Sequence, residues 1–124
     1  MTNKVLVLGG SGMLGSKAFE VLQGRFDTYA TFRNNSNVPE PSFHVDVMDF
    51  DRVKEVLEWV KPDVVVNCIG VLKDETNPIT SITVNALFPH QLAKYCKKLI
   101  HISTDCVFSG DWGWYDEEHW PDPD

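Results

Sequence analysis

The sequence predicts an α/β fold in which helices flank a doubly wound parallel sheet. Short apolar runs typical of buried strands alternate with segments of helical periodicity, and a glycine-rich turn joins the first run to the first helical segment. Strands that alternate with helices pair in parallel and are connected by right-handed crossovers. The order β-α-β-(β)-α-β-α-β therefore predicts a sheet of about five strands.

The first predicted strand is the apolar run Lys4–Leu8, which contains β-branched valines. A helical stripe with i, i+4, i+7, i+8 spacing follows the glycines, and Gly24 ends this helix. The stripe consists of Leu14, Ala18, Val21 and Leu22. A second strand is expected at Thr28–Phe32, and an aperiodic loop at Asn34–Pro41.

The middle of the chain predicts a short strand, a helix and a buried strand. The short strand is Phe43–Val45, and Asp49 is the expected N-cap of the helix. The helical stripe consists of Phe50, Val53, Leu57 and Val60. Residues 61–63, with a central proline, end the helix, and the run Val64–Ile69 is the next strand.

One long helix and one more strand are expected near the C-terminus. After a loop at Asp74–Pro78, the helix covers Ile79–Lys98. Its apolar side consists of Ile82, Ala86, Ala93 and Cys96. Because an interior proline costs about 3 kcal/mol, Pro89 either kinks this helix or marks a start near residue 88, and we favour the kink. Leu99–Thr104 is the last strand, and as an apolar edge it invites pairing with another chain.

Length, charge and cysteine content exclude several classes of protein. A chain of 124 residues is expected to form one domain. It contains neither an apolar run long enough to cross a membrane nor a secretory signal, so a cytoplasmic location is the default expectation. Of 18 acidic side chains, six follow Gly110, whereas all 11 Lys and Arg precede it. This acidity argues against a nucleic-acid partner. Cys68, Cys96 and Cys106 are scattered, which indicates reduced thiols and no metal site.

The glycine turn carries the strongest functional signal. Gly9-x-x-Gly12-x-x-Gly15 permits a tight exit from the strand, close approach of a diphosphate and close packing of the helix, whose N-terminus offers free N–H groups. A flexible turn without a ligand is the alternative. The predicted cofactor-binding segment is Gly9, Ser11, Gly12, Met13, Leu14 and Gly15.

Arg33 bears on the choice of cofactor. An NAD site usually places an acid about 20 residues beyond the glycines to bind the ribose 2′-hydroxyl, but the second strand ends in Phe32-Arg33. A guanidinium there suits the 2′-phosphate of NADP(H), with NAD(H) as the weaker alternative. A solvated surface arginine is the other interpretation of this residue.

Four segments give the chain a resemblance to a known family. VLVLGGSGMLG, PDVVVNCIG, VNALFPHQLA and HISTDCVFSG are similar to the extended short-chain dehydrogenase/reductase superfamily, and within it to the dTDP-4-dehydrorhamnose reductases. The resemblance implies a Rossmann-type sheet, and it covers only the first part of a family member. Residues 1–110 are therefore expected to form an NAD(P)-binding Rossmann domain truncated after about five strands, and residues 111–124 an acidic Trp- and Pro-rich loop that leads to a missing C-terminal part.

Further cofactor contacts are expected where strands end and on the following helix. They are Asp46, Val47, Asn67, Cys68, Gly70 and Asn85. The resemblance implies that Asp46 binds the adenine amino group and that Asn85 supports a catalytic lysine. Gly70 would let the dinucleotide pass close to the chain. A helix-initiating acid at Asp46 and a plain strand-to-loop glycine at Gly70 are the alternatives.

The resemblance also implies NADP(H)-dependent reduction of the 4-keto group of a nucleotide sugar. Thr104 matches the hydroxyl that positions the carbonyl, with a plain β-branched strand residue as the alternative, and Asp105 matches an acid that contacts the substrate or its surroundings. The catalytic Tyr-x-x-x-Lys pair is absent, since the residues four positions after the tyrosines are Arg33, Leu99 and His119. A non-catalytic nucleotide-binding or regulatory module, such as the regulatory subunit of methionine adenosyltransferase, is therefore the alternative function. The sequence does not fix the oligomeric state, and a homo-oligomer is compatible with it.

Overall fold

A computed structural model describes residues 3–34, 40–72 and 74–123 of the chain. Its core is a single parallel sheet with the strand order β3-β2-β1-β4-β5. The strands are β1 (Lys4–Leu8), β2 (Asp27–Phe32), β3 (Ser42–His44), β4 (Val64–Asn67) and β5 (Leu99–His101). The central place of β1 and the reversal of strand order on either side of it confirm the predicted Rossmann-type fold.

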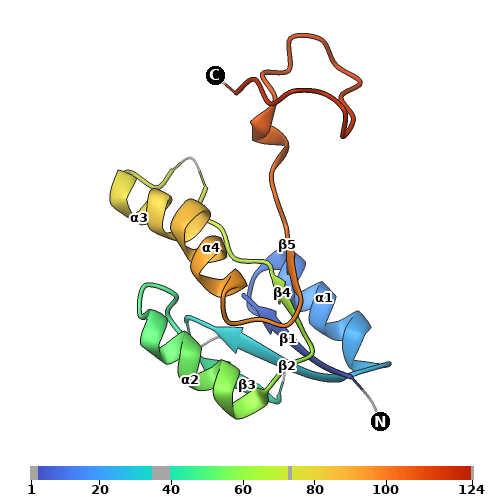
Figure 1. Ribbon diagram of the computed structural model, residues 1–124, viewed down its shortest axis with the longest axis vertical. Coiled ribbons are helices and arrows are strands. Elements are labelled where there is room, and N and C mark those ends of the chain that lie inside the picture. The colour runs from blue at the N-terminus through green and yellow to red at the C-terminus, as the bar shows by residue number, and fades with distance from the viewer. Residues whose placement is uncertain (1–2, 35–39, 73, 124) are drawn as a thin grey trace.

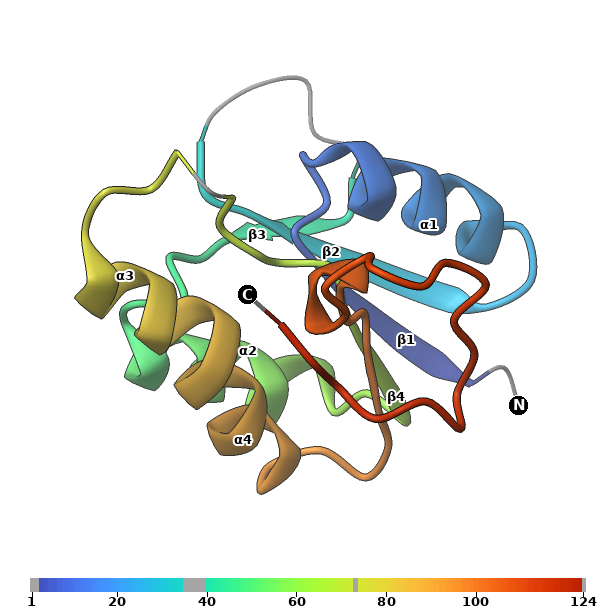
Figure 2. The ribbon, with the colours of Figure 1, turned by 90° about the horizontal axis from the view of Figure 1, so that it is seen from above.

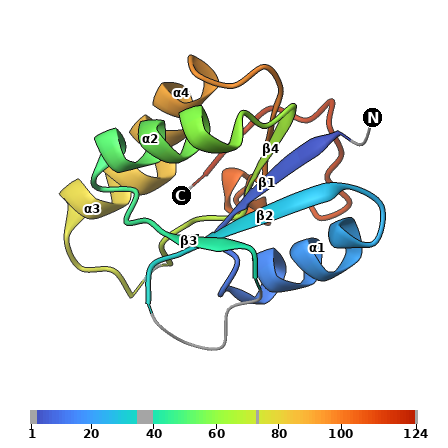
Figure 3. The same ribbon diagram turned by 90° about the horizontal axis from the view of Figure 1, so that it is seen from below.

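Helices cover the two faces of the sheet unequally. They are α1 (Met13–Gln23), α2 (Phe50–Val60), α3 (Pro78–Ile82) and α4 (Phe88–Ala93), with a π-helical segment, Thr83–Leu87, between the last two. Figures 2 and 3 show α1 on one side of the sheet and the other helices together on the opposite side. The main apolar core lies under α2 and α4, where Leu6, Val65 and Phe88 are fully buried. This packing confirms the predicted inner face of α2.

The predicted apolar stripe of α1 is only partly right, because Ala18 and Leu22 are half-buried but its other two residues are not. The helix buries Gly15 and Phe19, whereas Leu14 and Val21 are exposed. The glycine motif assigns Gly15 to close packing of the helix, but a glycine contributes no apolar side chain to the helical pattern, and the predicted stripe does not include Phe19.

The long helix predicted before β5 is helical over a shorter range. It begins at Pro78, contains the π segment and ends at Ala93, so residues 94–98 are a correction to the expected end at Lys98. Pro89 lacks an N–H for the carbonyl four residues earlier, and the chain accommodates it by the wider π turn just before α4. The predicted last two strands are also too long, since β4 ends at Asn67 and β5 at His101.

Beyond β5 the chain leaves the sheet and forms a separate hydrogen-bonded tail (Figure 1). Ser109 closes this tail, because its N–H and hydroxyl both bond the Asp122 carboxylate at 2.9 Å. Trp112, Trp114 and Trp120 remain 82%, 97% and 88% exposed. The predicted loop at 34–41 lies largely outside the described residues. No helix within the described ranges is long and apolar enough to span a membrane.

Candidate functional site

The glycine turn connects the end of β1 to the start of α1, and backbone hydrogen bonds fix its conformation. Gly9 has a φ of +86°, a left-handed conformation that favours glycine. The Gly12 N–H bonds the Gly9 carbonyl at 3.0 Å. Thr31 of β2 accepts two further hydrogen bonds from the turn. Its hydroxyl oxygen accepts the Gly9 N–H at 3.2 Å, and its carbonyl oxygen accepts the Gly10 N–H at 2.6 Å.

The room available for a side chain at each glycine of the turn differs, and this difference distinguishes their roles. A Cβ on Gly15 would lie 2.0 Å from the Gly9 carbonyl oxygen, so the helix packs on the turn only without a side chain. A Cβ on Gly12 would meet only that same oxygen, at the ordinary contact distance of 3.4 Å. The protein itself therefore does not require glycine at residue 12, and the space beside it is left open. Room for a ligand next to the main chain is what a bound diphosphate needs.

The N-terminus of α1 differs from those of α2 and α3. Asp49 caps α2 through the Arg52 N–H, as predicted, and Asn77 caps α3 through the Ile79 N–H. No side chain caps α1, which begins after Gly12. The first-turn N–H groups and the positive end of the helix dipole are thus available to an anion.

A cleft of about 250 Å³ opens beside the turn, at the carboxyl ends of β1, β2 and β4. Among the residues predicted to bind cofactor, it is lined by Gly9, Ser11, Gly12, Arg33, Val47, Cys68 and Gly70. Residues that the sequence did not single out complete its wall: Thr31, Phe32, Val45, Ile69, Val71 and Val84. A strand-end pattern could have indicated Phe32 and Ile69, but no local signal marks Val84, which reaches the cleft from the π segment.

The remaining predicted cofactor residues lie around this cleft without lining it. Met13 and Leu14 are 93% and 46% exposed at the start of α1, and Gly15 is buried beneath them. Asp46 follows β3 and accepts the Met48 N–H at 2.9 Å, in a local turn. This bond uses one carboxylate oxygen.

Two asparagines hold the loop after β4 in place. Asn67 is fully buried, accepts the Ile69 N–H at 3.1 Å and lies 3.1 Å from the His101 ring. Asn85 bonds the backbone of Val71 twice, accepting its N–H at 2.9 Å and donating to its carbonyl at 3.0 Å. Both amides therefore shape the cleft wall that contains Cys68. Burial raises the pKa of the Cys68 thiol.

The predicted catalytic residue lies farther from the sheet than expected. Thr104 is exposed three residues beyond β5, and its hydroxyl accepts the Cys106 N–H at 3.1 Å, so that it caps a 3-10 turn at Asp105–Val107. Thr104 and Asp105 are not among the residues that line the cleft. Within the described part of the chain, no cluster of His, Cys, Asp and Glu could hold a metal.

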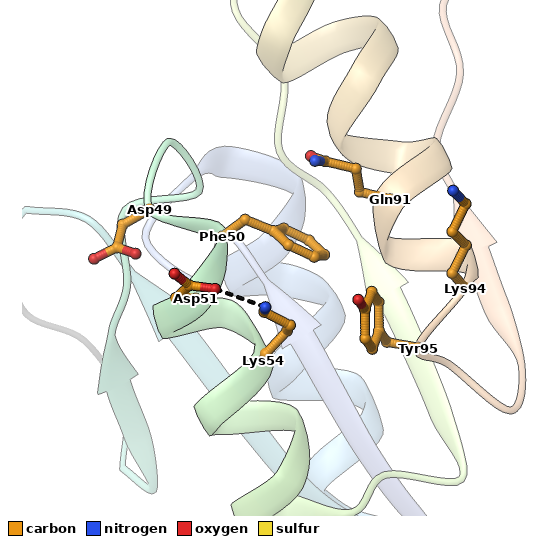
Figure 4. A pocket seen from close by; sticks show the side chains of 7 residues that line it. All are labelled: Asp49, Phe50, Asp51, Lys54, Gln91, Lys94 and Tyr95. Atoms are coloured by element: carbon orange, nitrogen blue, oxygen red, sulfur yellow. Dashed lines mark ion pairs between the residues drawn. The ribbon is translucent and has the colours of Figure 1, made fainter.

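A larger hollow of about 400 Å³ lies between α2 and α4 and contains none of the predicted site residues (Figure 4). Two of its charged groups pair with each other: Lys54 lies 2.6 Å from Asp51 and about 6 Å from the rings of Phe50 and Tyr95. The cleft at the glycine turn is lined by predicted cofactor residues and lies beside the uncapped N-terminus of α1, and it is therefore the candidate site.

Similar proteins point to reductases. A probable low-salt glycan biosynthesis reductase of Haloferax volcanii is 35% identical over 94% of this chain and 42% of its own length. A dTDP-4-dehydrorhamnose reductase of Streptomyces griseus is 33% identical over 92% of this chain and 38% of its own length. The methionine adenosyltransferase 2 subunit beta of Danio rerio is 31% identical over 97% of this chain. The chain thus spans about two fifths of the length of these relatives.

Solved structures repeat the fold with two different cofactors. The dTDP-4-dehydrorhamnose reductase of Bacillus anthracis, in complex with NADP, has a TM-score of 0.79 and 27% identity over 99% of this chain and 44% of its own. The UDP-glucose 4-epimerase of Thermus thermophilus, in complex with NAD, has a TM-score of 0.82 and 28% identity over 97% of this chain and 44% of its own.

A family model agrees with these similarities. The model of the RmlD substrate binding domain matches residues 3–124 of this chain. The chain therefore belongs to the family of the RmlD substrate-binding domain, which comprises dTDP-4-dehydrorhamnose reductases and related sugar-nucleotide reductases.

Proposed function

We propose that this chain binds NADP(H) in the cleft at the glycine turn and supplies the cofactor-binding half of a reductase for 4-keto nucleotide sugars. One observation carries the proposal: the main chain at Gly12 is open, and the N-terminus of α1 beside it has no side-chain cap. In this proposal residues 1–110 form the cofactor domain, and residues 111–124 lead toward the substrate side.

The proposed cofactor contacts follow the cleft from one strand end to the next. The uncapped amides of the first turn of α1, beside the open main chain at Gly12, bind the diphosphate. Arg33, at the end of β2, pairs with the 2′-phosphate, and the free carboxylate oxygen of Asp46 accepts from the adenine amino group. Cys68 and Gly70 form the wall along which the rest of the dinucleotide extends, and Asn85 supports that wall through Val71.

The chemistry proposed for the substrate side begins at Thr104. A reduced nicotinamide, when bound, would supply the hydride for the carbonyl carbon. The exposed Thr104 hydroxyl would orient the carbonyl oxygen by a hydrogen bond. Asp105 accepts from a hydroxyl of the sugar. No residue of this chain is assigned as the proton donor, because no tyrosine here is followed four positions later by lysine.

A non-catalytic nucleotide-binding module is the second candidate, and the similarity to the methionine adenosyltransferase subunit favours it. Both candidates share the cofactor cleft, so cofactor binding does not separate them. The reading frame that encodes this chain does: a Tyr-x-x-x-Lys pair within about ten codons after residue 124 favours the reductase, and its absence favours the module.

Isothermal titration of NADPH and of NADH into this chain tests the proposed cofactor site. We expect binding of both, with the tighter dissociation constant for NADPH because only its 2′-phosphate reaches Arg33. Equal constants would reject the NADP(H) preference, and no heat from either dinucleotide would reject the cofactor site as a whole.

A further inference from the structure

Thr31 touches the glycine turn through both its side chain and its main chain. The hydroxyl oxygen accepts the Gly9 N–H at 3.2 Å, and the carbonyl oxygen accepts the Gly10 N–H at 2.6 Å. Thr31 is 1% exposed, Gly9 is half-buried, and both residues lie in the wall of the cleft. The turn also lies tightly against the neighbouring residue, because a Cβ on Gly10 would come within 2.8 Å of the Ala30 Cβ.

These bonds distinguish the amides of the turn, which are used inside the protein, from the first amides of α1, which are not capped. Gly9 and Gly10 donate to Thr31, and Gly12 donates to the Gly9 carbonyl, so their N–H groups are used inside the protein. The first amides of α1 have no side-chain cap, and they come directly after this group in the chain. The contacts to Thr31 thereby determine where the uncapped amides lie relative to β2.

We propose that Thr31 is a positioning residue for dinucleotide binding, and that its hydroxyl holds the Gly9 peptide so that the free amides at the start of α1 face the diphosphate. The inference rests on the proposed cofactor site. Thr31 acts on the binding of the diphosphate, which NADPH and NADH both contain. Arg33 acts on the 2′-phosphate, which only NADPH contains.

The side chain can be separated from the backbone by substitution. Thr31→Val keeps the shape and the Gly10 bond but leaves the Gly9 N–H without its acceptor. Thr31→Ser restores the hydroxyl. Thr28→Val is the matched control, because Thr28 is a buried threonine of the same strand whose hydroxyl bonds the Phe26 carbonyl at 3.1 Å, near the opposite end of β2.

The experiment measures dissociation constants of the complete chain for NADPH and NADH by isothermal titration, together with melting temperatures. For Thr31→Val we expect both constants to rise by a similar factor, about three- to tenfold for one lost hydrogen bond, so that their ratio is unchanged. Thr31→Ser should bind within about twofold of the wild type. Thr28→Val should melt at a lower temperature yet bind both dinucleotides as the wild type does.

The outcomes separate this inference from the proposed function. Wild-type affinity in Thr31→Val overturns the inference alone, and so does an equal loss in Thr28→Val, because the effect would then be one of stability. Failure of the wild type to bind either dinucleotide overturns the cofactor site and this inference with it. If Thr31→Val does not fold, Thr31→Ala, which also lacks the hydroxyl and adds no bulk, takes its place under the same expectations.

Discussion

Gly12 and Gly15 belong to one turn, but the protein makes different demands on them. A Cβ on Gly15 would overlap the Gly9 carbonyl oxygen, whereas a Cβ on Gly12 would fill open space beside the uncapped helix. One glycine therefore serves the fold, and the other leaves room for a ligand.

Substitution by alanine should separate these two roles. Gly15→Ala should destabilise the chain by about 1–3 kcal/mol through overpacking and lower its melting temperature. Gly12→Ala should leave the melting temperature nearly unchanged, because a poorer N-cap and a less flexible unfolded chain offset each other. It should weaken NADPH binding at least about tenfold. Melting curves and titration calorimetry check both variants, and unaltered affinity in Gly12→Ala would contradict the proposed diphosphate position.

Arg33 gives a second prediction for a single side chain. Arg33→Ala should weaken NADPH binding by about ten- to a hundredfold, since a charge-assisted bond contributes about 1.5–3 kcal/mol, and should leave NADH binding nearly unchanged. The measurement is the pair of dissociation constants. Equal losses for both dinucleotides would assign the 2′-phosphate elsewhere. Lys17→Ala, on the exposed face of α1, controls for the change in net charge.

Individual residues of the cleft were predictable to different degrees. The glycines carry their own signature, because each replaces a side chain at a fixed spacing between strand and helix. Thr31 carries none: a β-branched residue suits any strand, and its contact with Gly9 exists only once β2 lies beside β1.

At the scale of elements, Asp63 fastens the beginning of β4 to β1. Its carboxylate accepts the Lys4 N–H at 2.9 Å and pairs with the Lys97 ammonium at 3.2 Å. The backbone bond from Lys4 and then the Lys97 ammonium lower the pKa of Asp63 below its usual value of about 3.9.

The pH dependence of stability follows from this lowered pKa. A carboxylate with a depressed pKa contributes stability above its unfolded pKa, and this contribution is lost as the pH falls through the folded pKa. Asp63→Asn should therefore lower the melting temperature at pH 7, and the difference from the wild type should shrink below about pH 4. Thermal melts at several pH values test this. Glu20→Gln, in an exposed pair on α1, is the control, and a difference that persists at low pH would contradict the assignment.

Helix boundaries show where sequence periodicity stops being informative. The stripe and N-cap of α2 were readable because they are local, and the structure confirms them. The π segment before α4 reflects a compromise around Pro89, and the end at Ala93 depends on the approach to β5, so neither could be read from periodicity.

At the scale of the whole molecule, β5 is an edge of the sheet as the structure describes it. Ile100 and Ile102 are 44% and 43% exposed there. The fold itself was predictable, because alternating strands and helices leave few topologies for a parallel sheet. The direction of the tail was not, since the pattern after Gly110 contains no periodicity.

An exposed apolar edge should promote self-association of this chain. Ile100→Lys should reduce it, because a lysine at an edge opposes pairing with another strand. Val21→Lys is the matched control, since Val21 is 62% exposed on α1, away from the edge. Sedimentation velocity over a range of concentrations measures the effect. Equal self-association of all three proteins would show that β5 is not the contact.

The exposed tryptophans of the tail have a practical consequence. Their indole rings stand in water although Phe108 and Tyr115 stack inside the same loop with centroids 4.5 Å apart. Their fluorescence should accordingly be that of hydrated indole, with red-shifted emission that iodide quenches. A molecule that covers the tail would shift the emission to the blue and shield it, so the chain carries its own optical reporter for events on that side.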